Sequence, residues 1–178
     1  MSGGRYVAFL RAINVGKRRV AMDDLLAAVE PVGLDGAWTH IASGNLVFGS
    51  DRSPAELEPA IEAALVDALG FEAEAFVRPT GRVDELVAAT PFAPTGDATT
   101  HLVVFVRSPL DPPRAAAVEA LSGDVDKLVV DGAELHWRIR GKSMDTALAP
   151  RDWRATDIGP TTSRNITMLT KLAARLAG

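Results

Sequence analysis

Cysteine is absent from the 178 residues of this chain. Its absence excludes disulfide bonds, thiolate metal sites, iron–sulfur clusters and cysteine nucleophiles. The chain also has no apolar run of about 18 residues, the length that would span a bilayer. The first ten residues, MSGGRYVAFL, lack the apolar segment and cleavage site of a signal peptide. We therefore expect a soluble cytoplasmic protein with no membrane partner.

Histidines and aromatic residues are also scarce. The three histidines lie far apart in the sequence, and no two of them have the spacing of a zinc motif. No pair of carboxylates has a spacing typical of acid–base catalysis, so we predict no metal site and no cofactor, and we assign no catalytic residue. Aromatic residues make up 6% of a chain whose net charge is −4, which disfavours nucleic-acid binding.

The charge that is present is unevenly distributed along the chain. Residues 1–20 hold five basic residues and no acidic ones, and residues 137–178 hold eight basic and three acidic ones. Between them, residues 21–97 hold three basic and fourteen acidic residues. Positive charge is thus concentrated at the two chain ends, where we look for an anion-binding site; the alternative is an ordinary surface whose charges balance in three dimensions.

The first half predicts a β-α-β-β-α-β order. Residues 5–13 are apolar on both faces, as in a central strand, and residues 23–33 form a short helix. Residues 37–50 predict two strands around a tight turn at Ser43, Gly44 and Asn45. Ser53, Pro54 and Glu56 predict the capped start of a helix that ends at Gly70, and a strand over 72–79 follows. This order is that of a ferredoxin-like, split β-α-β unit.

The second half predicts a related β-α-β-β-α order without a clear sequence repeat. A connecting helix over 81–90 precedes a strand over 100–108, and Asp111 caps a helix opened by two prolines. Residues 126–141 form a hairpin that turns at Asp131 and Gly132. The fold class is therefore α+β, with two tandem ferredoxin-like units over 1–79 and 80–178, mainly antiparallel sheets and a C-terminal helix. The two units could also form one compact domain.

The last helix contains the first candidate site. The stretch PTTSRNITMLTKL predicts a helix start near Thr162 or Ser163, which places Arg164 in the first turn. A cation is unfavourable at this end of a helix dipole unless an anion lies nearby. Arg164 and the backbone N–H groups after Ser163 are therefore a candidate anion site, to which Asn165 and Thr167 could add hydrogen bonds. The alternative is that Arg164 pairs with an internal carboxylate.

Two loops of the first half supply the other candidates. Arg11 lies in an otherwise apolar strand and needs a partner, and Asn14 and Gly16 follow in a turn rich in cations. This loop is not a phosphate-binding P-loop, because the required first glycine and the final Ser or Thr are missing. The turn at Ser43 lacks the glycines of a nucleophile elbow, so a plain hairpin turn is favoured over a nucleophilic serine.

The motifs LRAINVG, IASGNLVF and TTSRNITMLTKL, in this order, resemble those of an uncharacterised and mostly bacterial family, domain-of-unknown-function family 1697. The family pattern reads L-R-G-I-N-V-G, then T-Y-I-x-S-G-N-V-x-F, then T-x-R-N-x-x-T-x-x-K-L. Ala12 and His40 depart from it, replacing a glycine and a tyrosine. The resemblance implies paired ferredoxin-like units and no established reaction. The positions that match the pattern are Arg11, Asn14, Gly16, Ser43, Gly44, Asn45, Thr162, Arg164, Asn165, Thr167 and Lys171.

From these motifs we predict that the N-terminal loop, the Ser-Gly-Asn turn and the start of the last helix converge into one polar pocket. The expected partner is a small molecule that carries a phosphate or carboxylate group. Three alternatives stay open: an enzyme acting on a phosphorylated substrate, a protein that binds single-stranded nucleic acid, and arginines that only tie the two halves together. The sequence leaves the oligomeric state open.

Overall fold

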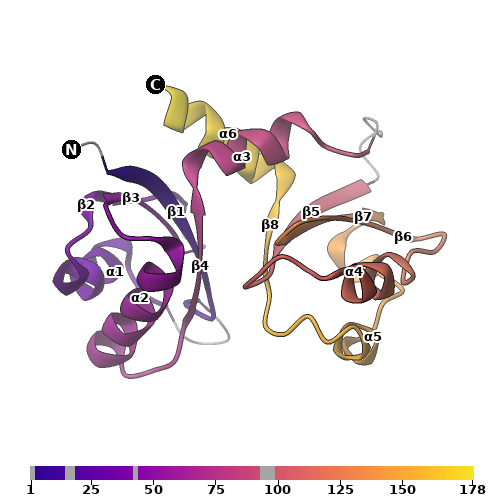
Figure 1. The fold of residues 1–178 in the computed structure, drawn as a ribbon, viewed down its shortest axis with the longest axis horizontal. Coiled ribbons are helices and arrows are strands. Elements are labelled where there is room, and N and C mark those ends of the chain that lie inside the picture. Colours follow the sequence, from indigo (N-terminus) through magenta and orange to yellow (C-terminus); the bar gives the residue numbers. More distant parts are fainter. Residues whose placement is uncertain (1–2, 15–18, 42–43, 93–98) are drawn as a thin grey trace. The chain divides into compact units, whose positions relative to one another are not determined.

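The protein consists of two compact units, Met1–Val83 and Asp84–Gly178, each with its own four-stranded sheet (Figure 1). The structure is a computed structural model and describes residues 3–14, 19–41, 44–92 and 99–178. No helix within these ranges is both long and apolar enough to cross a membrane. That the units are separate domains, divided after residue 79, stays a prediction.

Unit 1 has the predicted ferredoxin-like topology. Its sheet has the strand order β2-β3-β1-β4, and all neighbouring strands are antiparallel, so β1 is central as its two apolar faces predict. Its elements are β1 (Gly4–Arg11), α1 (Met22–Val29), the 3-10 turn η1 (Glu30–Val32), β2 (Asp35–Thr39), β3 (Asn45–Ser50), α2 (Pro54–Leu69) and β4 (Glu74–Pro79).

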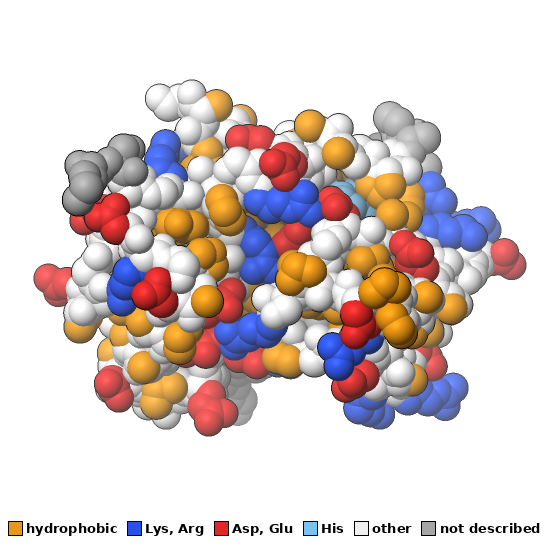
Figure 2. Space-filling model, viewed as in Figure 1, with side chains coloured by type: hydrophobic (Ala, Val, Ile, Leu, Met, Phe, Trp, Pro, Cys, Tyr) orange, Lys and Arg blue, Asp and Glu red, His pale blue; other side chains and the backbone are white. Residues whose placement is uncertain are grey.

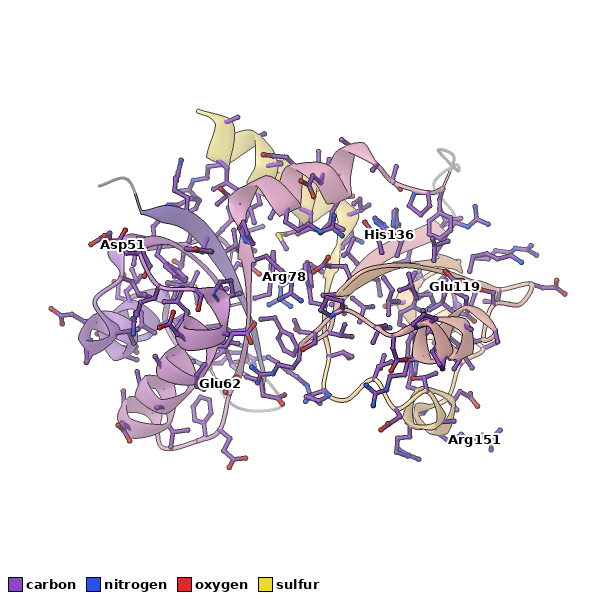
Figure 3. All side chains as sticks on the ribbon, viewed as in Figure 1. Asp51, Glu62, Arg78, Glu119, His136 and Arg151 are labelled. Atoms are coloured by element: carbon purple, nitrogen blue, oxygen red, sulfur yellow. The ribbon has the colours of Figure 1, made fainter. Side chains whose placement is uncertain are left out.

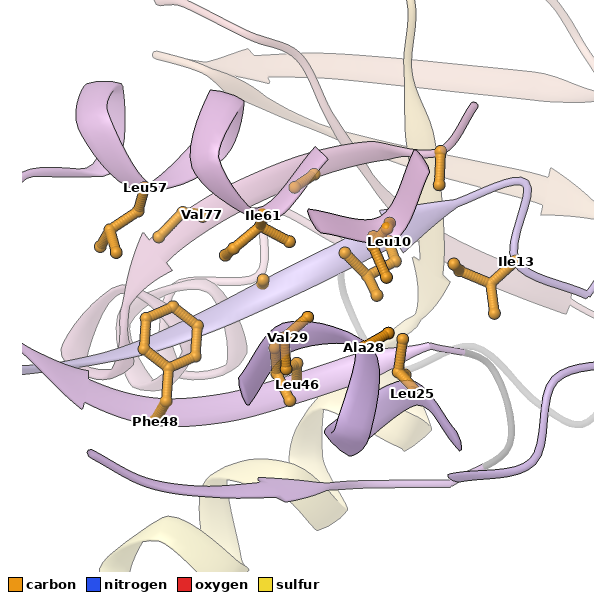
Figure 4. Packing of buried hydrophobic residues seen from close by; sticks show 14 of the residues in the cluster. Leu10, Ile13, Leu25, Ala28, Val29, Leu46, Phe48, Leu57, Ile61 and Val77 are labelled. Atoms are coloured by element: carbon orange, nitrogen blue, oxygen red, sulfur yellow. The ribbon is translucent and has the colours of Figure 1, made fainter. Parts of the chain in front are cut away.

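Helices α1 and α2 cover one face of this sheet. The start of α2 has the predicted capping box between Ser53 and Glu56, and the helix ends at Gly70, which has a left-handed φ of 73°. Leu25 of α1 and Ile61 of α2 pack with Leu46 of β3 in a cluster that also holds side chains from β1 and β4 (Figure 4). Burial of this apolar face is the main force that holds the helices on the sheet.

Carboxylates on the helices satisfy backbone donors of two edge strands. Glu62 of α2 accepts a hydrogen bond from the backbone N–H of Ala75 at 2.9 Å. Glu119, the last residue of helix α4 (Pro112–Glu119), accepts one from Val130 N in unit 2, also at 2.9 Å; Figure 3 labels both glutamates. Edge strands whose backbone groups are already bonded are poor templates for further pairing.

Unit 2 repeats this topology with the strand order β6-β7-β5-β8, again antiparallel throughout. Asp111 caps α4 as predicted, by accepting a hydrogen bond from Arg114 N at 2.9 Å. The elements from the connecting helix onward are α3 (Thr80–Ala88), β5 (Thr99–Phe105), α4 (Pro112–Glu119), β6 (Asp126–Asp131), β7 (Glu134–Arg140), the 3-10 turn η2 (Ser143–Asp145), α5 (Pro150–Ala155), β8 (Thr162–Asn165) and α6 (Ile166–Ala177).

The start predicted for the last helix, near Thr162 or Ser163, is wrong. Thr162–Asn165 form the strand β8, and α6 begins at Ile166 with Asn165 as its N-cap. Arg164 therefore lies in a strand and not in the first turn of a helix. Along β8, Thr162 and Arg164 are buried while Ser163 and Asn165 are exposed. This alternation of burial is typical of a strand. It does not appear as an alternation of apolar and polar residues in the sequence, because one of the buried residues is an arginine.

Helices α4 and α5 cover one face of the second sheet. Val118 of α4 and Trp153 of α5 pack with Leu135 and Val104 of the sheet. Because side chains alternate across a strand, the neighbours of these sheet residues point to the opposite face. That face carries polar groups from three strands: His101, His136, Arg138 and Arg164.

The strand register aligns the two units residue by residue. Val7 of β1 pairs with Arg78 of β4, and Val103 of β5 pairs with Arg164 of β8. In each unit one residue then separates this arginine from the next helix, α3 or α6. The alignment matches YVAFLR (6–11) to LVVFVR (102–107), with identical Val, Phe and Arg. The repeated fold is therefore accompanied by a short sequence repeat, which becomes visible only when the strand register aligns the two units.

Candidate functional site

A pocket of about 360 Å³ lies in unit 2, between the polar face of the sheet and the start of α6. Its volume falls in the range typical of small-molecule sites. A small area of histidine surface is visible in Figure 2 beside hydrophobic side chains. None of the described lining residues is acidic. They are Val87, Thr90, Phe92, Thr99, His101, Arg138, Asn165, Ile166, Thr167 and Thr170.

Arg138 is the fixed positive charge of this pocket. Its guanidinium carbon lies 5.0 Å from the centre of the Phe92 ring, a cation–π contact that orients the side chain. Across the described ranges, Arg138 has neither a carboxylate partner nor a hydrogen bond to its guanidinium. Several other arginines are paired: Arg11 with Glu74, Arg78 with Glu58, and Arg114 with Asp157. No described residue occupies the five N–H donors of Arg138.

His101 contacts a second histidine behind the pocket wall. Its Nε2 lies 2.9 Å from Nδ1 of His136, which is labelled in Figure 3 and is only 1% exposed. The Phe92 ring lies edge-on to both imidazoles. Burial, and then the nearby charges of His136 and Arg138, lower the pKa of His101 to about 4. His101 is therefore neutral at pH 7 and acts through hydrogen bonds and not through charge.

The start of α6 forms another wall of the pocket. Asn165 caps the helix, because its Oδ1 accepts a hydrogen bond from Thr167 N at 2.8 Å. The side-chain NH2 group of Asn165 (Nδ2) and the hydroxyl of Thr167 form no hydrogen bond to any residue that the structure describes. The positive end of the helix dipole adds to the field of Arg138. This wall therefore presents donors and a favourable potential to an anion.

Of the predicted C-terminal residues, Asn165 and Thr167 line this pocket, but Thr162, Arg164 and Lys171 do not. Arg164 is buried, and it donates hydrogen bonds to Thr162 Oγ1 at 2.9 Å and to the Ser163 carbonyl at 2.8 Å. Burial lowers the pKa of its guanidinium to about 10. Lys171 is exposed on α6. Thr162 and Arg164 thus belong to the buried side of β8.

Arg11 and Asn14 in unit 1 are bonded within the protein. The guanidinium of Arg11 forms an ion pair with Glu74, its cross-strand neighbour on β4. Glu74 belongs to the same unit as Arg11, so this ion pair does not tie the two units together. The side chain of Asn14 accepts a hydrogen bond from Val20 N at 2.9 Å. Gly16 lies outside the described residues.

The Ser-Gly-Asn turn also has a structural explanation. Gly44 has a φ of +74°, and an added Cβ would lie 3.2 Å from Cβ of Leu10. Its carbonyl accepts a hydrogen bond from Leu10 N at 2.8 Å, which ties the turn to β1. Asn45 is fully buried, and its side chain donates to the His40 carbonyl at 2.9 Å. Ser43 lies outside the described residues.

The predicted site residues divide between the units. Arg11, Asn14, Gly44 and Asn45 are described in unit 1, and the C-terminal set lies in unit 2. Their convergence into one pocket stays a prediction. Four further residues of the pocket were not predicted from the sequence as site residues: Phe92, Thr99, His101 and Arg138. The hairpin predicted over 126–141 places Arg138 in a strand. Local sequence does not indicate which residues of a distant strand lie beside Arg138, so the pocket itself could not be predicted.

A further acidic residue acts as a structural anchor. Asp126 is 1% exposed and accepts hydrogen bonds from Trp137 Nε1 at 2.8 Å, Thr146 Oγ1 at 2.7 Å and Ala147 N at 2.8 Å. Because its oxygens accept one bond from β7 and two from residues 146–147, Asp126 fastens the segment after η2 to β6.

Comparisons with known proteins agree with the motif resemblance. No curated protein matches the chain. Among solved structures, the conserved bacterial protein SP0830 from Streptococcus pneumoniae has a similar fold, with a TM-score of 0.77 and 22% sequence identity over 99% of this chain and 100% of that one. The model of the family described as "Protein of unknown function (DUF1697)" matches residues 4–136. Since that match covers most of the sequence, the chain belongs to the DUF1697 family.

Proposed function

We propose that this protein binds a small molecule that carries a phosphate or carboxylate group, in the pocket of unit 2. The observation that carries the proposal is Arg138, which lines the pocket and has no carboxylate partner among the described residues. A partly buried cation without an internal counterion is expected to favour an external anion.

The pocket offers a complete set of anion contacts. The planar guanidinium can form two parallel hydrogen bonds to a phosphate or carboxylate. Asn165 and Thr167 add uncharged donors beside the positive end of α6. A hydrogen bond to a charged group contributes roughly 1.5–3 kcal/mol net. Loss of the Arg138 contact should therefore weaken anion affinity about 10- to 100-fold.

Thermal unfolding in the presence of inorganic phosphate and of sulfate tests the proposal. A ligand at ten times its Kd stabilises the folded state by roughly 1.4 kcal/mol, which raises Tm by a few degrees for a chain of this size. Chloride at matched ionic strength corrects for general salt effects. We expect the phosphate-dependent shift to disappear in Arg138→Gln.

Arg140→Gln is the matched control, because Arg140 is exposed at the end of the same strand and does not line the pocket. It removes the same charge and should keep the shift. Lys171→Gln serves the same purpose on α6. No shift with either anion, or equal shifts in wild type and Arg138→Gln, would refute anion binding at this pocket.

A further inference from the structure

A hydrogen-bonded pair of histidines borders the pocket, His101 in its wall and His136 behind it. Nε2 of His101 and Nδ1 of His136 lie 2.9 Å apart, so one of them carries the shared hydrogen and the other accepts it. His136 is buried and does not line the pocket, whereas His101 is partly exposed and does. The remaining ring nitrogen of His101, Nδ1, has no hydrogen-bond partner among the described residues.

The position of the shared hydrogen determines what His101 offers to a ligand. If His101 Nε2 carries it, neutral His101 has a bare Nδ1 that accepts a hydrogen bond. If His136 Nδ1 carries it, neutral His101 must have its hydrogen on Nδ1, which then donates. A hydroxyl group can satisfy either state, because it both donates and accepts. A carbonyl group or an ammonium group can satisfy only one of them.

We propose that His101, held by His136, recognises a hydroxyl group on the ligand whose anionic group binds Arg138. This inference rests on the proposed function and narrows the ligand class to small hydroxylated anions, such as polyol phosphates and hydroxy acids. Arg138 and His101 are directly cross-strand from each other, so both groups can contact one small molecule. The volume of about 360 Å³ suits a compound of that size.

His101 is neutral at pH 7. The described groups whose charge acts on it are His136 and Arg138, both on β7. Arg140 and Arg164 share this face of the sheet but do not line the pocket, and the lining residues from α6 and from 87–92 carry no charge. Burial, and then His136 and Arg138, lower the pKa of His101 to about 4. The hydroxyl contact should therefore persist down to about pH 5, where an ordinary histidine is charged.

Matched pairs of probes test the inference. Calorimetric titration compares glycerol 3-phosphate with propyl phosphate, and glycerate with propionate. The first member of each pair carries hydroxyl groups that the second lacks. One neutral hydrogen bond corresponds to an affinity advantage of about threefold to tenfold. In the wild type we expect the hydroxylated probe to bind more tightly in the phosphate pair, the carboxylate pair or both. A pair that shows this difference identifies an anionic group that the pocket accepts.

Variants at His101 separate recognition from folding. His101→Leu should abolish the advantage of the hydroxylated probe, so that glycerol 3-phosphate and propyl phosphate bind this variant with equal affinity. His101→Gln keeps a donor and an acceptor and should restore part of the advantage. If His101→Leu fails to fold, nitrogen NMR of the wild type still tests whether His101 and His136 share a hydrogen. The ring signals are few enough to assign, because the protein has only three histidines.

The outcomes distinguish this inference from the proposed function. If phosphate binds in an Arg138-dependent manner but hydroxylated and plain probes bind equally, the hydroxyl site is refuted and anion binding stands. If no probe binds, both are refuted. An NMR titration in which His101 becomes charged near pH 6.5, without a hydrogen shared with His136, would also overturn the inference.

Discussion

Ala12 shows at the scale of a single residue how a departure from the family pattern affects the backbone. Its φ is +66°, in the left-handed region that favours glycine, and glycine is the residue that the family pattern has at this position. A left-handed backbone costs an alanine roughly 1–2 kcal/mol. The strain lies directly beside the Arg11–Glu74 ion pair. Ala12 is thus a point at which this chain is less stable than its family pattern allows.

Ala12→Gly should stabilise the protein. Relief of the strain outweighs the greater conformational freedom of glycine in the unfolded chain, and we expect a net gain of about 0.5–1 kcal/mol. Urea denaturation measures the difference. Ala116→Gly, at an exposed position inside α4, is the control and should lose about 1 kcal/mol. A loss of stability in Ala12→Gly would show that this backbone conformation is not strained.

His101 should make stability depend on pH. In the unfolded chain it gains a proton near pH 6.5, whereas in the folded protein it gains one only near pH 4. The unfolded state therefore binds more protons in this window, and the folded state loses stability as the pH falls from about 6.5 to 4. After allowance for partial exposure, the loss at pH 5 is on the order of 1 kcal/mol.

Urea denaturation at pH 7 and pH 5 measures this loss. The wild type should lose about 1 kcal/mol more than His101→Gln, since the variant lacks the titrating group. The difference between the two proteins removes the contribution of carboxylates, which both share. An equal loss in both would mean that His101 titrates normally in the folded protein.

Single elements were predictable to the extent that their signals are local. The start and end of α2 follow from Ser53, Glu56 and Gly70, all of which act within one helical turn. The strand β8 escaped prediction because it is four residues long and has Arg164 on its buried side. The pairing of His101 with His136 depends on the register of two strands that are distant in sequence. Such a register is determined by the packing of the whole sheet.

The contribution of Asn165 to the stability of α6 can be measured separately from its contribution to anion binding. Asn165→Ala removes the hydrogen bond to Thr167 N and should cost about 1 kcal/mol. Asn165→Asp keeps a good cap and should preserve stability, but it places a negative charge beside the anion site. We expect Asn165→Asp to weaken phosphate binding more than Asn165→Ala does.

Unfolding curves and phosphate titrations of the two Asn165 variants check this order. If Asn165→Asp bound phosphate as well as the wild type, the start of α6 would not contribute to the anion site. If Asn165→Ala were as stable as the wild type, the cap would contribute nothing measurable.

At the scale of the whole molecule, the chain is built from one pattern used twice. Both units have the same strand order, and β3 and β7 each begin opposite a phenylalanine, Phe9 of β1 or Phe105 of β5. The sequence predicted the shared architecture because element order is visible in it. It did not reveal the matching residues, because the identical positions are few and only the strand register aligns them. The pocket shows that the two units have diverged, since its lining residues all belong to unit 2.

The aligned phenylalanines give a test of the repeat. Phe9 and Phe105 are both fully buried, and truncation of a buried phenylalanine to alanine costs roughly 3–5 kcal/mol. We expect Phe9→Ala and Phe105→Ala to destabilise the protein by similar amounts within that range, because each occupies the same place in its own sheet. Val66→Ala, at a position that is 40% exposed on α2, should change stability by less than about 0.5 kcal/mol. A cost below about 1 kcal/mol at either phenylalanine would mean that the two central strands do not hold equivalent core positions, and the repeat would then be one of topology alone.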